Sequence, residues 1–272
     1  MANEPFFRRD GDQYQPTPAC RGPWDPKSLH GRVVAGLLAF EIDRKHGDPD
    51  FHPARLTVDL YRLPDFSPVT VTTSAVREGG RIRVIDAEWT SGGLSMGRAS
   101  CQLLRRTANA DGNIWSPPNW DVPTPEEIEV PEGRSLMGGM WATRTINNHT
   151  GLGGGDSGDG KGGEAGEGLG PKRAWISEVR ELVEGIPLTP WMRVALAADF
   201  TNPFANSGDK GLGYINTDIT LYLHRLPRAE WIGFEVASQH ASDGVAVGEC
   251  FLYDTEGAIG TSTVTALAQR RS

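Results

Sequence analysis

Few residues in this chain are spaced for nucleophilic or metal chemistry. Gly93–Gly97 is the only literal Gly-x-Ser-x-Gly match, but its Ser95 lies in a predicted hairpin, without the strand–turn–helix context of a nucleophile elbow. None of the three cysteines has a histidine close to it in the sequence, and His46 with His52 lacks a third ligand at a sensible spacing. We therefore expect neither a serine or thiolate nucleophile nor a bound metal ion, and no cofactor.

The strongest candidate for acid–base chemistry is Asp218, which begins a predicted strand. In that strand Ile219, Leu221 and Leu223 alternate to one face, so Asp218 lies on the opposite face. Partial burial of that face against a neighbouring unit of the fold would make Asp218 a suitable general base. The alternative is that Asp218 only closes the turn Asn216–Asp218 and bonds backbone amides.

The elements that position such residues occur twice along the chain. Two blocks, about 20–106 and 174–272, each begin with an apolar run of helical period. In each block a strand follows that ends in Arg-Leu-Pro, at 62–64 and at 225–227. Two alternating strands, a turn and a closing strand ending in paired arginines complete each block. The repeated order indicates a duplicated α+β unit, with one long helix packed on an antiparallel sheet of four or more strands.

The pattern predicts particular helices and strands. The predicted helices contain Val33–Ile42 and, after an N-cap at Thr189, Pro190–Ala198. The predicted strands before the closing ones are Leu56–Tyr61, Val69–Val76, Ile82–Trp89, Ile219–His224, Trp231–Ser238 and Gly244–Tyr253. Small residues on both helices indicate close contact between neighbouring layers.

A connector, 107–173, separates the two blocks. Its first part, Thr107–Pro131, is rich in proline and acidic residues, and we expect Trp115 and Trp120 to anchor it to the core. Its later part, Gly151–Gly170, is more than half glycine and cannot bury enough apolar surface to fold by itself. It lacks the strand and the Gly-Lys-Ser/Thr ending of a phosphate-binding loop, so a flexible linker or surface loop is predicted.

The order of several weak motifs resembles the acyl-CoA thioesterase II family of double hotdog proteins. The motifs are His30-Gly31, Asp218–Pro227, Glu230-Trp231 and Thr263–Thr265 before Arg270. The actinobacterial thioesterase-like branch is closer still, judged by Ala197–Phe200, Gly213–Asn216 and Leu252–Asp254. The resemblance implies a double hotdog fold, with two tandem repeats that each wrap an antiparallel sheet around a long helix.

The resemblance also implies hydrolysis of acyl-CoA by a water that an Asp, a Thr and a Gln activate. Asp218 falls on the family's Asp position. Gln239 stands where the family usually has Ser or Thr, and Thr265 stands where it usually has Gln, so both chemical types are present but exchanged. Each can donate to and accept from a water, or can be an ordinary strand residue.

His30 and Gly31 are candidate substrate-binding residues at the start of the first helix. Free backbone N–H groups there favour developing negative charge, and Gly31 would let a thioester carbonyl approach the backbone. His30 contacts the acyl group in this interpretation, or only caps its helix. An acyl slot would be lined by residues such as Leu37, Leu38 and Trp191, although core packing explains these equally well.

Two other functions compete with the hydrolase. The exchange of Gln239 and Thr265 leaves open a non-catalytic acyl-CoA-binding or scaffold protein of the same fold. An enoyl-CoA hydratase is less favoured, because families with that activity carry an Asp and a His five residues apart on one element. The nearest pair here, Asp48 and His52, has the wrong spacing and lies in a predicted loop.

Composition limits the remaining classes. The chain has 272 residues, enough for one large or two small domains, and 35 acidic against 27 basic side chains make nucleic acid an unexpected partner. No apolar run approaches a membrane span, and the start of the chain lacks the apolar region of a signal peptide. We expect a soluble, cytoplasmic protein with reduced thiols at Cys20, Cys101 and Cys250, which forms homo-oligomers through its sheet surface.

Overall fold

The computed structural model describes residues 4–118, 120–129, 141–146 and 172–269. The helices are α1 (Gly31–His46), α2 (Pro190–Ala198) and α3 (Thr201–Asn206). The strands of the first half are β1 (Phe7–Asp10), β2 (Gln13–Pro16), β3 (Phe51–Leu60), β4 (Val69–Glu78), β5 (Ile82–Ser91) and β6 (Leu94–Arg105). Those that follow are β7 (Ala142–Thr145), β8 (Arg173–Ser177), β9 (Ser207–Gly208), β10 (Gly211–Leu212), β11 (Tyr214–Asn216), β12 (Asp218–Leu223), β13 (Ile232–Ser242), β14 (Val245–Asp254) and β15 (Gly257–Ala268).

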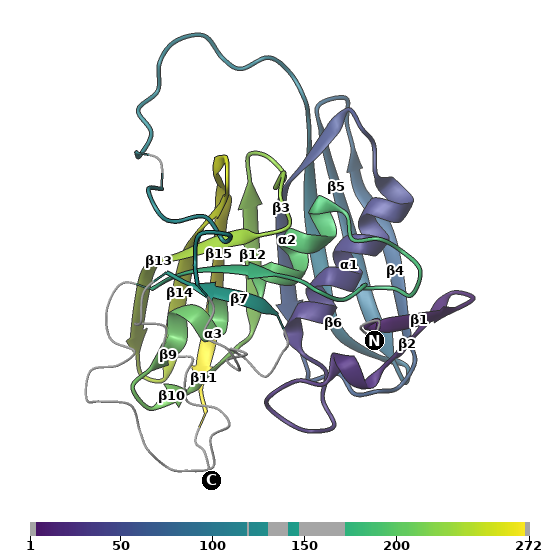
Figure 1. The fold of residues 1–272 in the computed structure, drawn as a ribbon. Helices are drawn as coiled ribbons and strands as arrows, with labels where there is room; N and C mark the ends of the chain where they lie inside the picture. The colour runs from purple at the N-terminus through teal and green to yellow at the C-terminus, as the bar shows by residue number, and fades with distance from the viewer. Residues whose placement is uncertain (1–3, 119, 130–140, 147–171, 270–272) are drawn as a thin grey trace.

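One antiparallel sheet of 13 strands runs through both halves of the described chain. Its order is β1-β2-β4-β5-β6-β3-β12-β15-β14-β13-β8-β7, and β11 adds to β15. The halves meet edge to edge at the β3–β12 pair, where Asp218 lies opposite Asp59 and Tyr222 opposite Arg55. The sheet curves around α1 in the first half and around α2 and α3 in the second (Figure 1). This is the double hotdog α+β fold that the repeat and the resemblance predict.

The helices begin where the capping residues predict. The side chains of His30 and Thr189 accept hydrogen bonds from the Arg32 and Met192 amides, and Pro190 occupies the first turn of α2. One difference concerns the second half, where the expected long helix is divided into α2 and α3. The interruption falls at Asp199 and Phe200, which keep helical backbone angles but carry no side-chain cap for α3.

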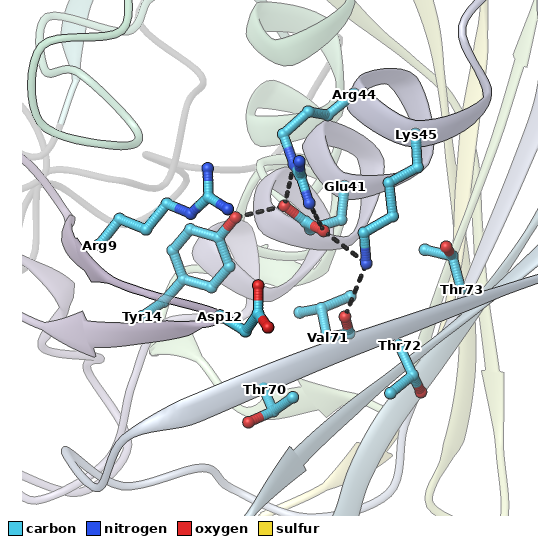
Figure 2. A pocket seen from close by; sticks show the side chains of 10 residues that line it. All are labelled: Arg9, Asp12, Tyr14, Glu41, Arg44, Lys45, Thr70, Val71, Thr72 and Thr73. Carbon is cyan, nitrogen blue, oxygen red and sulfur yellow. Dashed lines mark hydrogen bonds and ion pairs between the residues drawn. The ribbon is translucent and has the colours of Figure 1, made fainter.

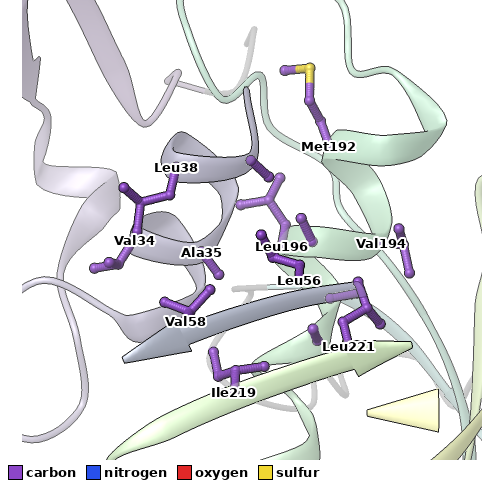
Figure 3. Packing of buried hydrophobic residues seen from close by; sticks show 14 of the residues in the cluster. Val34, Ala35, Leu38, Leu56, Val58, Met192, Val194, Leu196, Ile219 and Leu221 are labelled. Carbon is purple, nitrogen blue, oxygen red and sulfur yellow. The ribbon is translucent and has the colours of Figure 1, made fainter. Parts of the chain in front are cut away.

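The core lies between the helices and the central strands. Val34, Ala35 and Leu38 of α1 and Leu196 of α2 belong to one buried cluster with Leu56, Val58, Ile219 and Leu221 of the paired strands β3 and β12 (Figure 3). A Cβ atom on Gly36 would lie 2.6 Å from Leu196 Cδ2, so α1 and α2 pack with almost no space between them. This contact confirms the prediction that small residues bring the layers together.

The predicted strands are confirmed, with ends displaced by a few residues, whereas β1, β2 and the short strands β7 to β11 were not predicted. Of the two tryptophans expected to anchor the first part of the connector, only Trp120 does so. Trp120 stacks on Tyr253 with ring centroids 4.3 Å apart and covers Gly233. Trp115 is 82% exposed, so the prediction that it is an anchor is wrong. The segment Gly151–Gly170 lies outside the described residues.

The structure also bears on the expectations for the cysteine thiols, for membrane-spanning helices and for metal sites. Cys20, Cys101 and Cys250 are free and buried, and burial raises the pKa of each, to about 12 for Cys20 and Cys101. In the described part of the chain, no helix combines the length and apolar character needed to cross a bilayer. The described residues also contain no cluster of three or more metal-ligating side chains.

Candidate active site

Asp218 lies at the seam between the two halves, on the outer face of the sheet. Ile219 and Leu221 are 1% and 0% exposed beneath the helices, and the alternation of β12 turns Asp218 away from them. The first half therefore contacts β12 by pairing with its edge. It does not cover the face that carries Asp218, so the expectation that a neighbouring unit packs on that face is wrong. Asp218 Oδ1 accepts from the Thr265 backbone N–H at 2.6 Å and from the Thr265 hydroxyl.

A β-bulge explains these bonds. Asn216 lies opposite Ala266, but Thr220 lies opposite Thr263, so one extra residue is inserted between β11 and β12. The Thr217 carbonyl accepts from Leu60 of the first half, and the Thr265 N–H donates instead to Asp218. Asp218 thus satisfies a main-chain donor at the bulge, as the turn-closing alternative proposes.

Gln239 lies on the opposite face of the sheet from Asp218 and Thr265. It is opposite Gly248, which in turn is opposite Val264, a residue fully buried beneath the helices. Its Nε2 donates to Asn206 Oδ1 of α3 at 3.2 Å. The structure therefore brings Asp218 and Thr265 together and separates Gln239 from both.

His30 caps α1, and it also makes a second contact that the sequence did not predict. His30 Nδ1 lies 2.8 Å from Oδ2 of Asp199, the residue that follows α2, and both side chains are about 95% buried, with exposed fractions of 6% and 5%. Asp199 Oδ1 accepts from Asn216 Nδ2 at 3.0 Å. Residues from both halves thus form a buried polar chain of His30, Asp199 and Asn216 on the helix side of the seam.

The charge of Asp199 is maintained inside the protein. Burial by itself would raise the pKa of the Asp199 carboxyl. The hydrogen bond of His30, the Asn216 amide and the positive charge of Arg32 outweigh burial and lower the pKa below its ordinary value. Asp199 is therefore an ionised acceptor beside His30 at neutral pH.

Gly31 is close to Asp199. A Cβ atom on Gly31 would lie 2.7 Å from Asp199 Oδ1, too close for any real contact. The space beside Gly31, where we expected a thioester carbonyl, holds this carboxylate. Glycine is needed at the first helical position because the two halves approach there.

A second buried ion pair lies one residue further along α1. Arg32 Nη1 donates to Glu178 Oε2 at 3.0 Å, with both side chains 1% exposed. The Arg32 guanidinium also lies 4.4 Å from the centroid of the Trp141 ring. Burial raises the pKa of Glu178 and lowers that of Arg32, because desolvation disfavours both charges.

Other sequence candidates are engaged in packing. Leu37 and Leu38 are fully buried and Trp191 is 3% exposed, and the cavity that Trp191 borders is only about 30 Å³. That volume holds about one water and not an acyl chain. Asp48 pairs with Arg83, and His52 Nε2 lies 2.9 Å from the Leu223 carbonyl oxygen, so the two do not act as a pair.

A polar cavity of about 310 Å³ lies at the other end of α1, between that helix, the β1–β2 hairpin and β4 (Figure 2). Its floor is Glu41, whose carboxylate accepts from the Tyr14 hydroxyl, from Arg44 at 2.7 Å and from Lys45 at 2.9 Å. Burial would raise the pKa of Glu41, but these donors outweigh it and lower the pKa to about 2. Most of the charge around the cavity is therefore paired within the protein.

Replacing Glu41 with glutamine is expected to lower the free energy of unfolding by about 2–3 kcal/mol at pH 7. The folded pKa lies below the unfolded one, so the contribution is complete above about pH 4.5 and is lost as pH falls towards 2. Urea unfolding of both proteins at pH 7 and pH 3 measures this, and the difference should be smaller at pH 3. Asp12→Asn, on an exposed carboxylate of the same cavity, should change stability by less than about 0.5 kcal/mol. A Glu41→Gln effect no larger than that would contradict the argument.

Two models of protein families match most of the chain. The model of the acyl-CoA thioesterase N-terminal domain matches residues 20–108, and that of the acyl-CoA thioesterase C-terminal domain matches residues 138–268. The chain belongs to the acyl-CoA thioesterase family. No curated protein matches it.

Solved structures of acyl-CoA thioesterases and related proteins share its fold. The tesB protein of Mycobacterium avium subsp. paratuberculosis is 13% identical, with 97% of this chain and 96% of that chain covered and a TM-score of 0.67. A putative thioesterase from Novosphingobium aromaticivorans is 18% identical, with 99% and 100% covered and a TM-score of 0.69. A putative thioesterase II from Thermobifida fusca is 13% identical, with 97% and 94% covered and a TM-score of 0.70. At these identities the likeness establishes the double hotdog fold alone.

Sequence reasoning on this member of the family missed Asp199, Asn216, Arg32, Glu178 and Trp141 as parts of a polar site. Asp199 and Asn216 belong to segments that carry the family resemblance, but they had no assigned role. An acidic residue directly after the apolar run of α2 is the one local signal that could have identified Asp199.

Proposed function

We propose that this chain hydrolyses the thioester of an acyl-CoA to a free acid and CoA, with water as the nucleophile. The observation that carries this proposal is the match, in order, to both domain models of the acyl-CoA thioesterase family. Buried polar residues at the seam between the two halves support it, because hydrolysis needs a proton acceptor and an oriented water. We also propose that the chain consists of two hotdog repeats, 20–106 and 174–272, joined by the connector 107–173.

Asp218 and Thr265 are proposed to position the site. The sequence-based hypothesis has Asp218 activate the water directly. Its Oδ1 already holds two donors of Thr265, and the bulge fixed in this way directs Asn216 towards Asp199 on the helix side. We therefore propose that Asp218 acts through the backbone, while Gln239 supports Asn206 of α3.

Asp218→Asn is expected to keep kcat within about tenfold of the wild-type value, because the amide oxygen still accepts from the Thr265 N–H. Asp218→Ala, which removes that acceptor, should lower kcat further. Free thiol released from a panel of short-chain to long-chain acyl-CoAs measures both, with melting temperatures recorded alongside. A loss of about 10²–10⁴-fold in Asp218→Asn would instead support direct proton transfer by Asp218.

The competing function is a non-catalytic acyl-CoA-binding or scaffold protein. Calorimetric binding of an acyl-CoA without thiol release from any member of the panel would support it.

We further propose that the protein is cytoplasmic, acts in fatty-acid metabolism and forms homo-oligomers through the outer face of the sheet. On the outer face of the second half of the sheet, the apolar side chains of Tyr222, Phe251 and Leu267 are 51%, 42% and 48% exposed. Light scattering would test this assembly, and a monomer would contradict it.

A further inference from the structure

We propose that His30 is the proton acceptor for the hydrolytic water, and that Asp199 and Asn216 position it. This assignment rests on the proposed thioester hydrolysis and names the catalytic group of that reaction. It places the chemistry on the helix side of the seam, where residues of both halves meet, and not at Asp218 on the outer face.

The hydrogen bonds of His30 determine its tautomer. Nδ1 lies 2.8 Å from the Asp199 carboxylate and 3.3 Å from the Arg32 backbone N–H. Nδ1 cannot carry a proton for Asp199 and also accept one from Arg32. Because the bond to an ionised carboxylate is shorter and charge-assisted, we assign the proton to Nδ1. Nε2 then carries the lone pair and is free to accept a proton.

Two nitrogen atoms near the start of α1, one on His30 and one on Trp141, make no hydrogen bond within the described residues. Within the described residues, the hydrogen bond and the ion-pair contact of the His30 ring are both made by Nδ1, and none is made by Nε2. The Trp141 ring lies nearly perpendicular to the His30 ring, with centroids 5.4 Å apart, and Trp141 Nε1 is a buried donor without a partner in the described part of the chain. Buried polar atoms are normally bonded to protein or to water. A water can donate to an acceptor such as Nε2, and a thioester carbonyl oxygen can accept from a donor such as the indole N–H.

Helix capping alone does not explain the arrangement. A cap needs one acceptor beside the Arg32 amide, which asparagine or serine provides without burying a carboxylate. Burying Asp199 costs solvation energy, and the chain carries glycine at position 31 to make room for it. A buried carboxylate that orients a histidine whose other nitrogen is free is the arrangement of an acid–base pair.

The reaction balances with these groups. The water oxygen forms a bond to the thioester carbonyl carbon while one of its protons passes to His30 Nε2, giving a tetrahedral intermediate. The C–S bond then breaks, and the sulfur leaves as the CoA thiolate with the bonding electron pair. The proton on Nε2 passes to that thiolate, which regenerates neutral His30 and releases the acid and CoA. Asp199 remains ionised throughout and stabilises the imidazolium.

The test compares two histidines of the same helix. His30→Asn keeps an acceptor for the Arg32 amide but cannot take up the proton, so kcat for thiol release should fall by about 10²–10⁴-fold. His46→Asn, at the opposite end of α1, should leave kcat within about twofold, since the His46 ring bonds to Thr73, away from the seam. Substrate affinity, measured by calorimetry with acyl-CoA, should change little in either variant. A His30→Asn variant with wild-type kcat would overturn the proposal.

A measurement on the unmodified protein keeps the assignment testable if His30→Asn fails to fold. Nitrogen NMR of the imidazole rings, with His30 assigned as the ring whose signals shift in Asp199→Asn, should report a proton on Nδ1 and none on Nε2. A proton resident on Nε2 would refute the role of acceptor. If the wild-type chain releases no thiol from any acyl-CoA, the proposed function fails first and this assignment fails with it.

Discussion

Replacing Glu178 with glutamine is expected to lower the free energy of unfolding by about 3–5 kcal/mol, among the largest effects of any conservative change in this chain. Glu178 and Arg32 are each 1% exposed, and the variant leaves the Arg32 guanidinium buried without its counter-charge. Glu178 Oε1 also accepts from the Val179 and Arg180 amides, at 3.0 and 3.1 Å, which fixes the turn after β8. Urea unfolding at pH 7 measures the loss.

An exposed ion pair provides the matched control. Glu230→Gln removes the partner of Arg193, but the Glu230 side chain is 74% exposed, and the expected change is about 0–1 kcal/mol. Replacing both members of the buried pair, as Arg32→Met with Glu178→Gln, should recover most of the stability, because the charge of Arg32 is gone and the glutamine oxygen still accepts from the Val179 and Arg180 amides. Equal effects of Glu178→Gln and Glu230→Gln would show that burial does not control the energy of the pair.

Most of the fold could be predicted from the sequence because the repeated pattern carries strong local signals. Apolar residues of helical period, the Thr189 cap and the two Arg-Leu-Pro endings place α1, α2, β3 and β12 within a few residues of their observed bounds. Strand β1 was missed because three of its four residues are exposed and charged, so it has no alternating pattern. Strands β7 and β8 are short, and they join the sheet because β8 pairs with β13 and β7 pairs with β8.

The candidate site was predicted less completely, for a different physical reason. Alternation along β12 correctly puts Asp218 on the face opposite Ile219, but alternation does not say what covers that face. His30 and Asp199 are far apart in the sequence, and they meet only because α1 and α2 pack against each other at the seam. Neither helix alone contains that information. The sequence therefore identifies residues able to do chemistry, and the packing of the halves determines which of them meet.

Gly31→Ala is expected to reduce kcat for thiol release by about 10²-fold, because a misplacement of about 1 Å is enough to cost that much. The new methyl group would lie 2.7 Å from Asp199 Oδ1, so the carboxylate must turn away from His30 and Asn216. The free energy of unfolding should fall by about 1–3 kcal/mol through the same overpacking. Thiol release and urea unfolding of the variant measure the two effects separately.

Gly36→Ala is the control within the same helix. Its methyl group would lie 2.6 Å from Leu196 Cδ2, the far end of a flexible side chain, and it touches no part of the polar chain at the seam. We expect a comparable loss of stability with kcat within about threefold of wild type. If both variants lost stability but only Gly31→Ala lost activity, the rate of the reaction would depend on the position of the Asp199 carboxylate. It would not depend on tight packing of the helices in general. Wild-type kcat in Gly31→Ala would mean that the reaction does not depend on where Asp199 holds His30.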